Sequence, residues 1–284
     1  MANDVSPDPL PTPVTEAGRD GLAALLARPD EAVVGLDFDG TLAPIVPDPD
    51  AARAHAGAVP ALAALAPEVR SVAVVTGRPV EAAVRLGGFA GVAGLDHLVV
   101  LGHYGAERWD AATGAVSAPD PHPGVAAVRA ALPEVIGGTA DARGATIEDK
   151  GFAVAVHTRR AERPEEALRA LREPLTDLAE GNGLVVEPGR LVLELRPPGM
   201  DKGVALTAYV HEVGARAVLY AGDDLGDLPA FAAVDKLRDE GLPGLLVCSG
   251  STEVEELAAR ADLVVDGPSG VVELLSALAA QAAR

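Results

Sequence analysis

Short, uninterrupted apolar runs alternate with longer stretches rich in alanine and leucine along most of the chain. The runs lie at 32–36, 72–75, 97–101, 217–221, 245–247 and 263–265. Runs of this kind are typical of strands that are covered on both faces. The stretches between them predict helices at 20–28, 57–66, 79–86, 203–213, 228–234, 252–259 and 270–282. This alternation of strand and helix indicates an α/β fold whose core is a doubly wound parallel sheet.

The hydrophobic pattern changes between residues 107 and 196. Candidate strands come in pairs there, within 106–116 around Thr113-Gly114, within 146–158 around Lys150-Gly151, and within 184–195 around Pro188-Gly189. Helices are predicted at 124–135 and 164–178. Because this stretch interrupts the parallel pattern, we predict an inserted α/β domain at 107–196 within a core of residues 21–106 and 197–284. The proline-rich residues 1–20 are predicted to form a flexible tail.

The composition narrows the classes of partner. The 284 residues include 42 acidic and 23 basic side chains, which give a formal net charge of −19. This charge repels phosphate backbones and anionic lipids, so we expect no nucleic-acid partner and no membrane partner. Aromatic residues make up only 3% of the chain, so the core must be built from alanine, valine and leucine. The single cysteine, Cys248, excludes an intrachain disulfide and indicates a reducing compartment.

The N-terminal segment predicts no export. It carries Asp4 and Asp8 and lacks the basic start and apolar stretch of a secretory signal. No uncharged apolar run approaches the roughly 20 residues that span a bilayer. We therefore expect a cytoplasmic protein.

The first candidate for chemistry is the segment 37–41, Asp-Phe-Asp-Gly-Thr, directly after the predicted strand 32–36. In open α/β sheets the reactive site lies beyond the carboxyl ends of the strands. A turn at Gly40 would let one carboxylate and a neighbouring backbone carbonyl converge on a cation. A loop with two solvated acids is the simpler interpretation, but the strand context favours a functional site.

A second acidic segment, Gly222–Asp227, follows the predicted strand 217–221. Four or five carboxylates at neighbouring strand ends would repel one another unless a cation lies among them. Carboxylate and carbonyl oxygens suit Mg²⁺, whose remaining ligands are water and substrate phosphate. The two segments together predict a magnesium site, whereas two independent acidic loops would be a poor explanation.

Two further segments fit a phosphate group. Thr76-Gly77-Arg78 stands between a predicted strand and a helix, where a hydroxyl and free backbone amides bind anions well. Lys202 also precedes a helix and could supply a fixed positive charge. Threonine–glycine turns and solvated lysines are common, but their positions in the strand–turn–helix pattern favour phosphate binding.

Together these groups suit the hydrolysis of a phosphate monoester. An ionised Asp37 could attack phosphorus and form an aspartyl-phosphate, which splits a very slow reaction into two easier steps. Mg²⁺ and Lys202 would neutralise charge on the phosphoryl oxygens. Asp39 could protonate the departing alkoxide and later deprotonate the attacking water.

The order of these motifs resembles that of the haloacid dehalogenase superfamily of phosphotransferases. Within it, residues 30–284 resemble the trehalose-6-phosphate phosphatases, including the segments 101–105 and 196–203. The resemblance implies a Mg²⁺-dependent phosphatase of trehalose 6-phosphate, with the inserted domain as its cap. It implies Asp37, Asp39 and Lys202 as catalytic residues, and Gly40, Thr76, Gly77 and Lys202 as phosphate-binding residues. It implies Asp37, Asp39 and Asp223 as metal ligands, with Asp227 behind them in the second shell.

The inserted domain carries the more discriminating resemblance. Glu148-Asp149-Lys150 followed by His157-Thr158-Arg159 is similar to a Glu-x-Lys…His-x-Arg pattern of that family, and Arg190 and Glu194 match a basic residue and a glutamate there. The resemblance therefore implies substrate recognition by Arg78, Glu148, Lys150, Arg159, Arg190 and Glu194. From the residues alone, polar pairs of this kind are equally expected on the solvated face of a small sheet.

The sequence departs from the family pattern at two places. Gly226 and Leu228 stand where threonine and glutamate are frequent, but both aspartates of the fourth motif, Asp223 and Asp227, are kept. Arg190 stands where lysine is frequent, which keeps the charge and changes the donor geometry. Neither departure removes a proposed catalytic group.

Several functional alternatives stay open at this point. The same chemistry could serve another sugar phosphate, such as sucrose phosphate or mannosyl phosphoglycerate. A non-catalytic sugar-phosphate sensor is disfavoured because the candidate catalytic residues are all present, and a dehalogenase because it needs no metal cluster. The expected partner is a small-molecule sugar phosphate, with a functional link to a trehalose-phosphate synthase, and the expected oligomeric state is a monomer.

Overall fold

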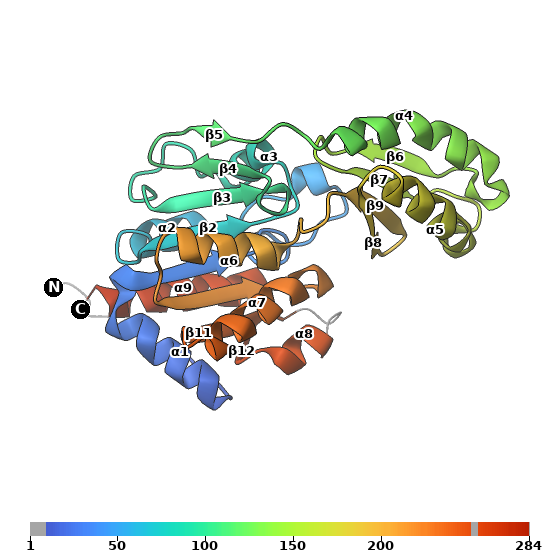
Figure 1. Cartoon of the computed structure of the whole chain (residues 1–284). Helices are drawn as coiled ribbons and strands as arrows, with labels where there is room; N and C mark the ends of the chain where they lie inside the picture. Colours follow the sequence, from blue (N-terminus) through green and yellow to red (C-terminus); the bar gives the residue numbers. More distant parts are fainter. Residues whose placement is uncertain (1–9, 251–254, 284) are drawn as a thin grey trace. The chain divides into compact units, whose positions relative to one another are not determined.

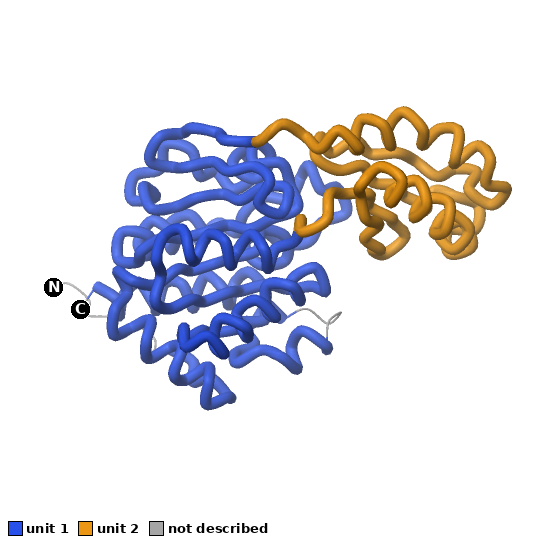
Figure 2. Tube along the Cα trace, viewed as in Figure 1, with its two compact units in different colours: residues 1–118, 201–284 blue, residues 119–200 orange. Residues whose placement is uncertain are grey.

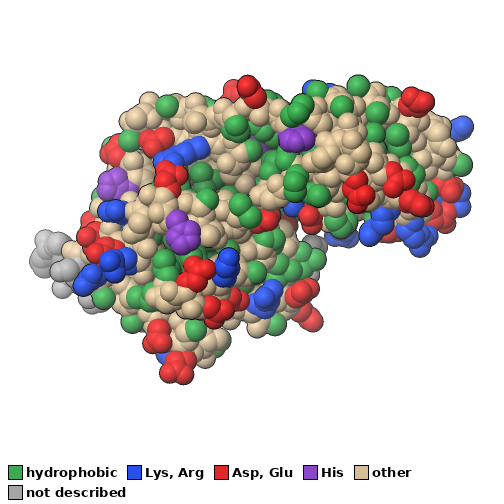
Figure 3. Space-filling model, viewed as in Figure 1, with side chains coloured by type: hydrophobic (Ala, Val, Ile, Leu, Met, Phe, Trp, Pro, Cys, Tyr) green, Lys and Arg blue, Asp and Glu red, His purple; other side chains and the backbone are tan. Residues whose placement is uncertain are grey.

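The structure is a computed structural model that describes residues 10–250 and 255–283. The chain forms two compact units (Figure 2). The core unit comprises the residues up to 118 and those from 201 onward, and the inserted unit comprises residues 119–200. Acidic side chains are spread over the face drawn in Figure 3, with basic ones among them. Among the described residues, no helix combines the length and the apolar character needed to cross a bilayer.

Within the described residues, the sheet of the core unit has eight strands in the order β12-β11-β10-β1-β2-β3-β4-β5. These are β1 (Ala32–Leu36), β2 (Ser71–Val75), β3 (Leu98–Gly102), β4 (Glu107–Asp110), β5 (Val116–Ser117), β10 (Ala217–Gly222), β11 (Gly244–Ser249) and β12 (Leu263–Val265). The strands from β12 to β3 are parallel, and β4 and β5 are antiparallel. Each of the six apolar runs forms a strand, because such runs can bury both faces.

Helices cover both faces of this sheet (Figure 1). They are α1 (Glu16–Ala27), α2 (Ala58–Leu65), α3 (Val80–Gly87), α6 (Lys202–Glu212), α7 (Leu228–Asp239), α8 (Glu255–Arg260) and α9 (Gly267–Ala282). Along β1, Val34 and Leu36 join the apolar cluster with α1, α2, α3 and α9, and Val33 joins the cluster with α6, α7 and α8. The predicted doubly wound α/β fold is therefore confirmed.

The start of α1 differs from the sequence prediction. The helix begins at Glu16, where the hydroxyl of Thr15 accepts a hydrogen bond from the Gly18 amide and donates one to the Asp262 carboxylate. This capping arrangement stabilises the first turn. The prediction of a flexible tail was therefore wrong for residues 16–20, whereas residues 1–9 lie outside the described part. The predicted helix at 252–259 also lies partly outside it.

The inserted unit is an antiparallel sheet covered on one face by two helices. Its strands are β6 (Thr146–Asp149), β7 (Val154–His157), β8 (Val185–Gly189) and β9 (Val192–Arg196), in the order β6-β7-β9-β8, and its helices are α4 (Pro123–Gly138) and α5 (Pro164–Glu180). Alternate residues of β7 and β9, such as Val154 and Leu193, pack in one apolar cluster with Leu132 of α4 and Leu171 of α5. The other face carries polar residues.

Two local predictions differ from the structure. The predicted boundary of the inserted domain lies at 107, but residues 107–110 and 116–117 extend the core sheet as β4 and β5. The turn predicted at Pro188-Gly189 lies two residues later, because Gly189 still pairs with Val192 in the ladder. Arg190 and Leu191 make the turn, and Leu191 adopts a left-handed φ of 59°.

Candidate active site

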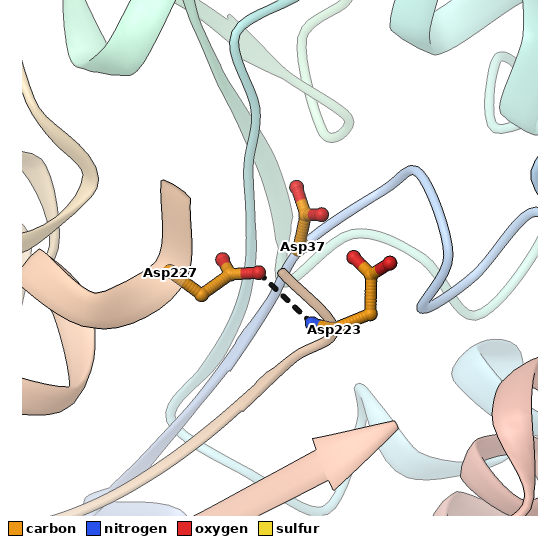
Figure 4. A group of neighbouring side chains, drawn as sticks. All are labelled: Asp37, Asp223 and Asp227. Atoms are coloured by element: carbon orange, nitrogen blue, oxygen red, sulfur yellow. Dashed lines mark hydrogen bonds between the residues drawn. The ribbon is translucent and has the colours of Figure 1, made fainter. Parts of the chain in front are cut away.

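The two acidic segments lie side by side at the carboxyl edge of the core sheet. Strand β1 lies between β10 and β2, and its last residue Leu36 is in register with Ala221 of β10. The Asp37 amide continues this ladder with a hydrogen bond of 2.9 Å to the Ala221 carbonyl. Carboxylate oxygens of Asp37, Asp223 and Asp227 consequently lie within 4.8 Å of one another (Figure 4).

Lys202 supplies the cation of this site. It is the first residue of α6, and the side chain of Asp201 caps the helix by accepting from the Val204 amide. The Lys202 ammonium is buried and lies 2.7 Å from Oδ1 of Asp37 and 2.7 Å from Oδ1 of Asp227. One ammonium therefore holds two carboxylates that come from different strand ends.

Protein donors occupy both oxygens of Asp227. Its Oδ1 accepts from Lys202 and from the Tyr220 hydroxyl at 2.7 Å, and its Oδ2 accepts from the amides of Asp223 at 2.9 Å and Asp224 at 3.2 Å. Asp227 thereby closes the 3-10 turn η5 (Leu225–Asp227) on the end of β10. This arrangement suits a carboxylate that orients Lys202 and the Asp223 loop better than one that binds a ligand directly.

The remaining carboxylates have perturbed proton affinities. Burial raises the pKa of Asp37 well above its ordinary value, although the nearby Lys202 ammonium opposes this shift. Burial, followed by the charges of Asp224 and Asp227, raises the pKa of Asp223 to about 7. Burial lowers the pKa of Lys202, but Asp227 and Asp37 outweigh it and the net shift is upward. All three upward shifts are typical of a buried site with an excess of carboxylates.

This donor set fits a divalent cation. Asp37 and Asp223 offer oxygens at one point, and a second positive charge there would offset both the burial and the neighbouring negative charges that raise their pKa values. Gly40 makes the approach possible: it has a left-handed φ of 74°, and a Cβ at this position would lie 1.9 Å from Oδ2 of Asp223. A side chain at residue 40 would therefore displace the Asp223 carboxylate.

Asp39 lies on the other side of the loop and pairs with Arg78. The guanidinium donates two hydrogen bonds of 2.7 Å, from Nε and from a terminal nitrogen, to the two oxygens of Asp39. The backbone amide of Arg78 donates to the hydroxyl of Thr76, which is buried at the end of β2. Asp39, Arg78 and Thr76, one candidate each for acid–base catalysis, substrate binding and phosphate binding, thus form one connected group in the core unit.

The candidate substrate residues of the inserted unit fall into two groups. Glu148 and Glu194 lie on the helix-free face in one row, because both pair with Ala155 in the register of the sheet. Lys150 joins them by donating a hydrogen bond to Glu194. By contrast, Arg159 follows the end of β7 and Arg190 lies in the β8–β9 turn, so the structure does not place these two exposed residues on that face.

Sequence reasoning missed two residues of the helix-free face. Arg196 donates a hydrogen bond of 3.0 Å to Glu187, and its other terminal nitrogen lies 3.6 Å from Oε1 of Glu194. Glu187 is in register with Glu194. Glu194 and Arg196 are two residues apart on β9, so the sequence indicates that their side chains lie on the same face. Glu187 of β8 is identified as their cross-strand neighbour only when the turn is placed at 190–191.

The comparisons with known proteins agree with this geometry. A family model described as trehalose-phosphatase matches residues 35–266. This chain belongs to the trehalose-phosphatase family. Its candidate catalytic residues, from Asp37 to Asp227, all lie within the matched segment.

Individual relatives point the same way. The chain is 34% identical, over 99% of its length and 68% of the relative's, to the trehalose-phosphate phosphatase of Mycobacterium marinum. It therefore spans about two thirds of that protein. The trehalose-6-phosphate phosphatase of Aspergillus fumigatus aligns with a TM-score of 0.69 at 24% identity, covering 95% of this chain and 99% of that one. A haloacid dehalogenase-like hydrolase from Bacteroides thetaiotaomicron, at 17% identity and a TM-score of 0.61 over 86% of this chain and 98% of that one, shares the fold.

Proposed function

We propose that this chain is a Mg²⁺-dependent phosphatase that hydrolyses trehalose 6-phosphate to trehalose and phosphate. The observation that carries the proposal is the placement of Lys202 between Asp37 and Asp227, with Asp223 adjoining, in a member of the trehalose-phosphatase family. A nucleophile, a fixed cation and a group of carboxylates that can hold a metal ion are what phosphoryl transfer from a dianionic ester requires.

Asp37 acts as the nucleophile. Its carboxylate oxygen forms a bond to phosphorus as the bond between phosphorus and the sugar oxygen breaks, which gives an aspartyl-phosphate. Water then attacks phosphorus and restores the carboxylate. Burial raises the pKa of Asp37 and favours its protonated form, whereas the Lys202 ammonium 2.7 Å away favours the ionised carboxylate that the attack requires.

Asp39 handles the protons in both steps. It donates one to the departing sugar oxygen and takes one back from the attacking water. The two hydrogen bonds from Arg78 fix the direction of this carboxylate. We therefore propose that Arg78 orients Asp39 in addition to its predicted role in substrate binding.

The carboxylates of Asp37 and Asp223 and the backbone carbonyl of Asp39 would hold Mg²⁺, with Asp227 orienting the loop behind them. When bound, the ion supplies positive charge that offsets the charge of the phosphoryl oxygens. Lys202 provides part of the same neutralisation from the protein side. The hydroxyl of Thr76 and the amide of Gly77 serve the phosphate group, and Gly40, whose own amide donates to the Ala43 carbonyl at 2.7 Å, leaves room for it.

The sugar is recognised by polar residues of the inserted unit. Glu194 and Glu148 accept hydrogen bonds from hydroxyl groups, while Lys150 donates them. The role of Arg159 and Arg190 rests on the resemblance alone, because both lie off the face that carries these three residues. In support, Oε1 of Glu194 is buried and forms no hydrogen bond within the described residues, so it has capacity for an incoming donor. Burying such an oxygen is costly unless a partner arrives.

A panel of phosphate esters tests the proposal. Phosphate release is measured from trehalose 6-phosphate, sucrose 6-phosphate, mannosyl phosphoglycerate and glucose 6-phosphate, with Mg²⁺ and with chelator. A metal-dependent preference for trehalose 6-phosphate is expected. Preference for another sugar would keep the chemistry and overturn the specificity, and no release from any ester would favour a sugar-phosphate sensor.

The remaining proposals concern the surroundings of the enzyme. We propose that it works as a monomer in the cytoplasm, with a trehalose-phosphate synthase supplying its substrate. The net charge of −19 supports the expectation that it has no nucleic-acid partner. Light scattering coupled to gel filtration measures the oligomeric state.

A further inference from the structure

An unusual turn follows β3 at the same edge of the sheet as Asp37. His103 and Tyr104 both adopt left-handed backbone conformations, with φ of 47° and 57°, and Gly105 follows with φ of 92°. Among the described residues, Leu191 is the other non-glycine residue with positive φ. Side chains rarely adopt this conformation, and it persists only where the surroundings impose it.

The loop that follows β2 imposes it. The His103 amide donates to the Arg78 carbonyl and the Tyr104 amide donates to the Thr76 carbonyl, both at 2.9 Å. A third connection runs from the Val80 amide, at the start of α3, to Oε2 of Glu107 at 2.8 Å. The strained turn and the candidate phosphate-binding loop are therefore held together at two points, and the bond between α3 and β4 supports them from the side.

The result of this clamp is the position of one phenol group. A Cβ added to Gly77 would lie 2.8 Å from the hydroxyl oxygen of Tyr104 and 2.9 Å from its Cζ. The tip of the tyrosine thus lies directly against Gly77, where any other residue would collide with it. Gly77 follows the buried Thr76, and β2 is the neighbour of β1, which carries Asp37 at its end.

We propose that the Tyr104 hydroxyl is part of the phosphate site and donates a hydrogen bond to a phosphoryl oxygen of the substrate. This inference rests on the proposed phosphatase function and adds a residue to its site. A phenol has an ordinary pKa of about 10, so it keeps its proton at neutral pH and is a dependable donor. The backbone clamp and the rigid ring fix its place before the substrate binds, which lowers the entropic cost of binding.

The test compares Tyr104→Phe with Tyr209→Phe as the matched control. Tyr209 is a buried tyrosine of α6, and its hydroxyl bonds at 2.7 Å to Ser71, the first residue of β2, at the opposite edge of the sheet. Inorganic phosphate binding in the presence of Mg²⁺ is measured by calorimetry. KM and kcat for trehalose 6-phosphate are measured on the same preparations, together with the melting temperature.

Tyr104→Phe is expected to weaken phosphate binding about tenfold and to raise KM by a similar factor; a tenfold change corresponds to about 1.4 kcal/mol. Tyr209→Phe is expected to lower the melting temperature and leave phosphate binding unchanged. Unchanged phosphate affinity in Tyr104→Phe would overturn the proposal, and so would a raised KM without weaker phosphate binding, because the contact would then be to the sugar.

A second variant separates strain from function. Tyr104→Gly relieves the left-handed conformation, so its melting temperature should stay level or rise while phosphate affinity falls as in Tyr104→Phe. Retained affinity in this variant would contradict the assignment. If the wild type binds phosphate but does not hydrolyse trehalose 6-phosphate, the proposed function fails while the Tyr104 assignment is still decided by calorimetry. A wild type that binds no phosphate would overturn both.

Discussion

The ammonium of Lys202 lies 2.7 Å from a carboxylate oxygen of Asp37, and both side chains are buried. Neither charge would be stable there alone, since burial raises the pKa of the carboxyl and lowers that of the amine. The proximity of Lys202 to Asp37 and Asp227 offsets the charge of two buried carboxylates and favours the ionised form of Asp37 that the proposed reaction requires.

Asp37→Asn should abolish turnover without unfolding the protein. The amide keeps the size of the carboxylate but cannot form the covalent phosphate intermediate. Because the wild-type carboxylate is buried among other acids, its removal should leave the melting temperature level or higher. Phosphate release and thermal unfolding are measured on one preparation. Substantial residual hydrolysis would remove Asp37 from the nucleophile role.

Lys202→Met should inactivate the enzyme and lower its stability by about 3–5 kcal/mol, the usual cost of leaving a buried charge without its partner. Lys202→Met combined with Asp227→Asn removes both charges, so it should recover much of the stability and none of the activity. Denaturant unfolding of the two single variants and the double variant gives the coupling free energy. Additive effects would show that the ion pair matters little to the fold.

The metal-free protein should lose stability as the pH rises from about 4 to 7. The pKa of Asp223 is about 7 in the folded protein and near 4 in the unfolded chain, so between these values the folded state binds more protons. The free energy of unfolding then falls by at most about 1.4 kcal/mol per pH unit from this group. Mg²⁺ added at pH 7.5 should restore stability by binding the folded state.

Asp223→Asn provides the control for this pH dependence. With chelator present, the variant should be more stable than the wild type at pH 7.5 and similar to it near pH 4, and it should gain little from Mg²⁺. Unfolding is followed at several pH values with and without metal. Identical pH profiles for the two proteins would contradict the raised pKa of Asp223.

Glu194→Gln should impair the use of trehalose 6-phosphate far more than the use of a small ester such as p-nitrophenyl phosphate. The carboxylate is buried, Lys150 and Arg196 face it, and one of its oxygens has no hydrogen bond within the described residues. We expect KM for the sugar phosphate to rise about tenfold or more. Glu165→Gln, an exposed substitution at the start of α5, is the matched control and should change the KM for neither ester. Equal losses on both esters would place Glu194 in folding and not in sugar recognition.

The core strands were predicted well because short runs of valine, leucine and alanine are typical of strands in a sheet covered on both faces. The location of β4 and β5 could not be predicted in this way. Their hairpin has a local signal in Thr113-Gly114, but its membership of the core sheet depends on pairing with β3. The start of α1 likewise depends on a distant partner, since Thr15 bonds to Asp262.

The candidate site shows the same division between local and distant information. The two acidic segments could be recognised in the sequence because each directly follows an apolar run that predicts a strand. Contacts between distant segments, such as Arg78 with Asp39, leave no pattern along the chain. In the inserted unit, Pro188-Gly189 is a typical turn dipeptide, yet the ladder continues through it and the partners of Glu194 change accordingly.

The order of the strands in the sheet also determines when each strand can pair during synthesis. Strand β1 begins at Ala32, but its neighbour β10 begins at Ala217, after the whole inserted unit. During synthesis, the apolar strand β1 therefore has one edge unpaired until β10 has been made, and an unpaired apolar edge is prone to aggregation. A ribosome-bound fragment that ends before residue 202 carries Asp37 but neither its ammonium partner nor the second acidic segment. The candidate catalytic groups therefore come together only after the segment from Lys202 to Asp227 has been synthesised.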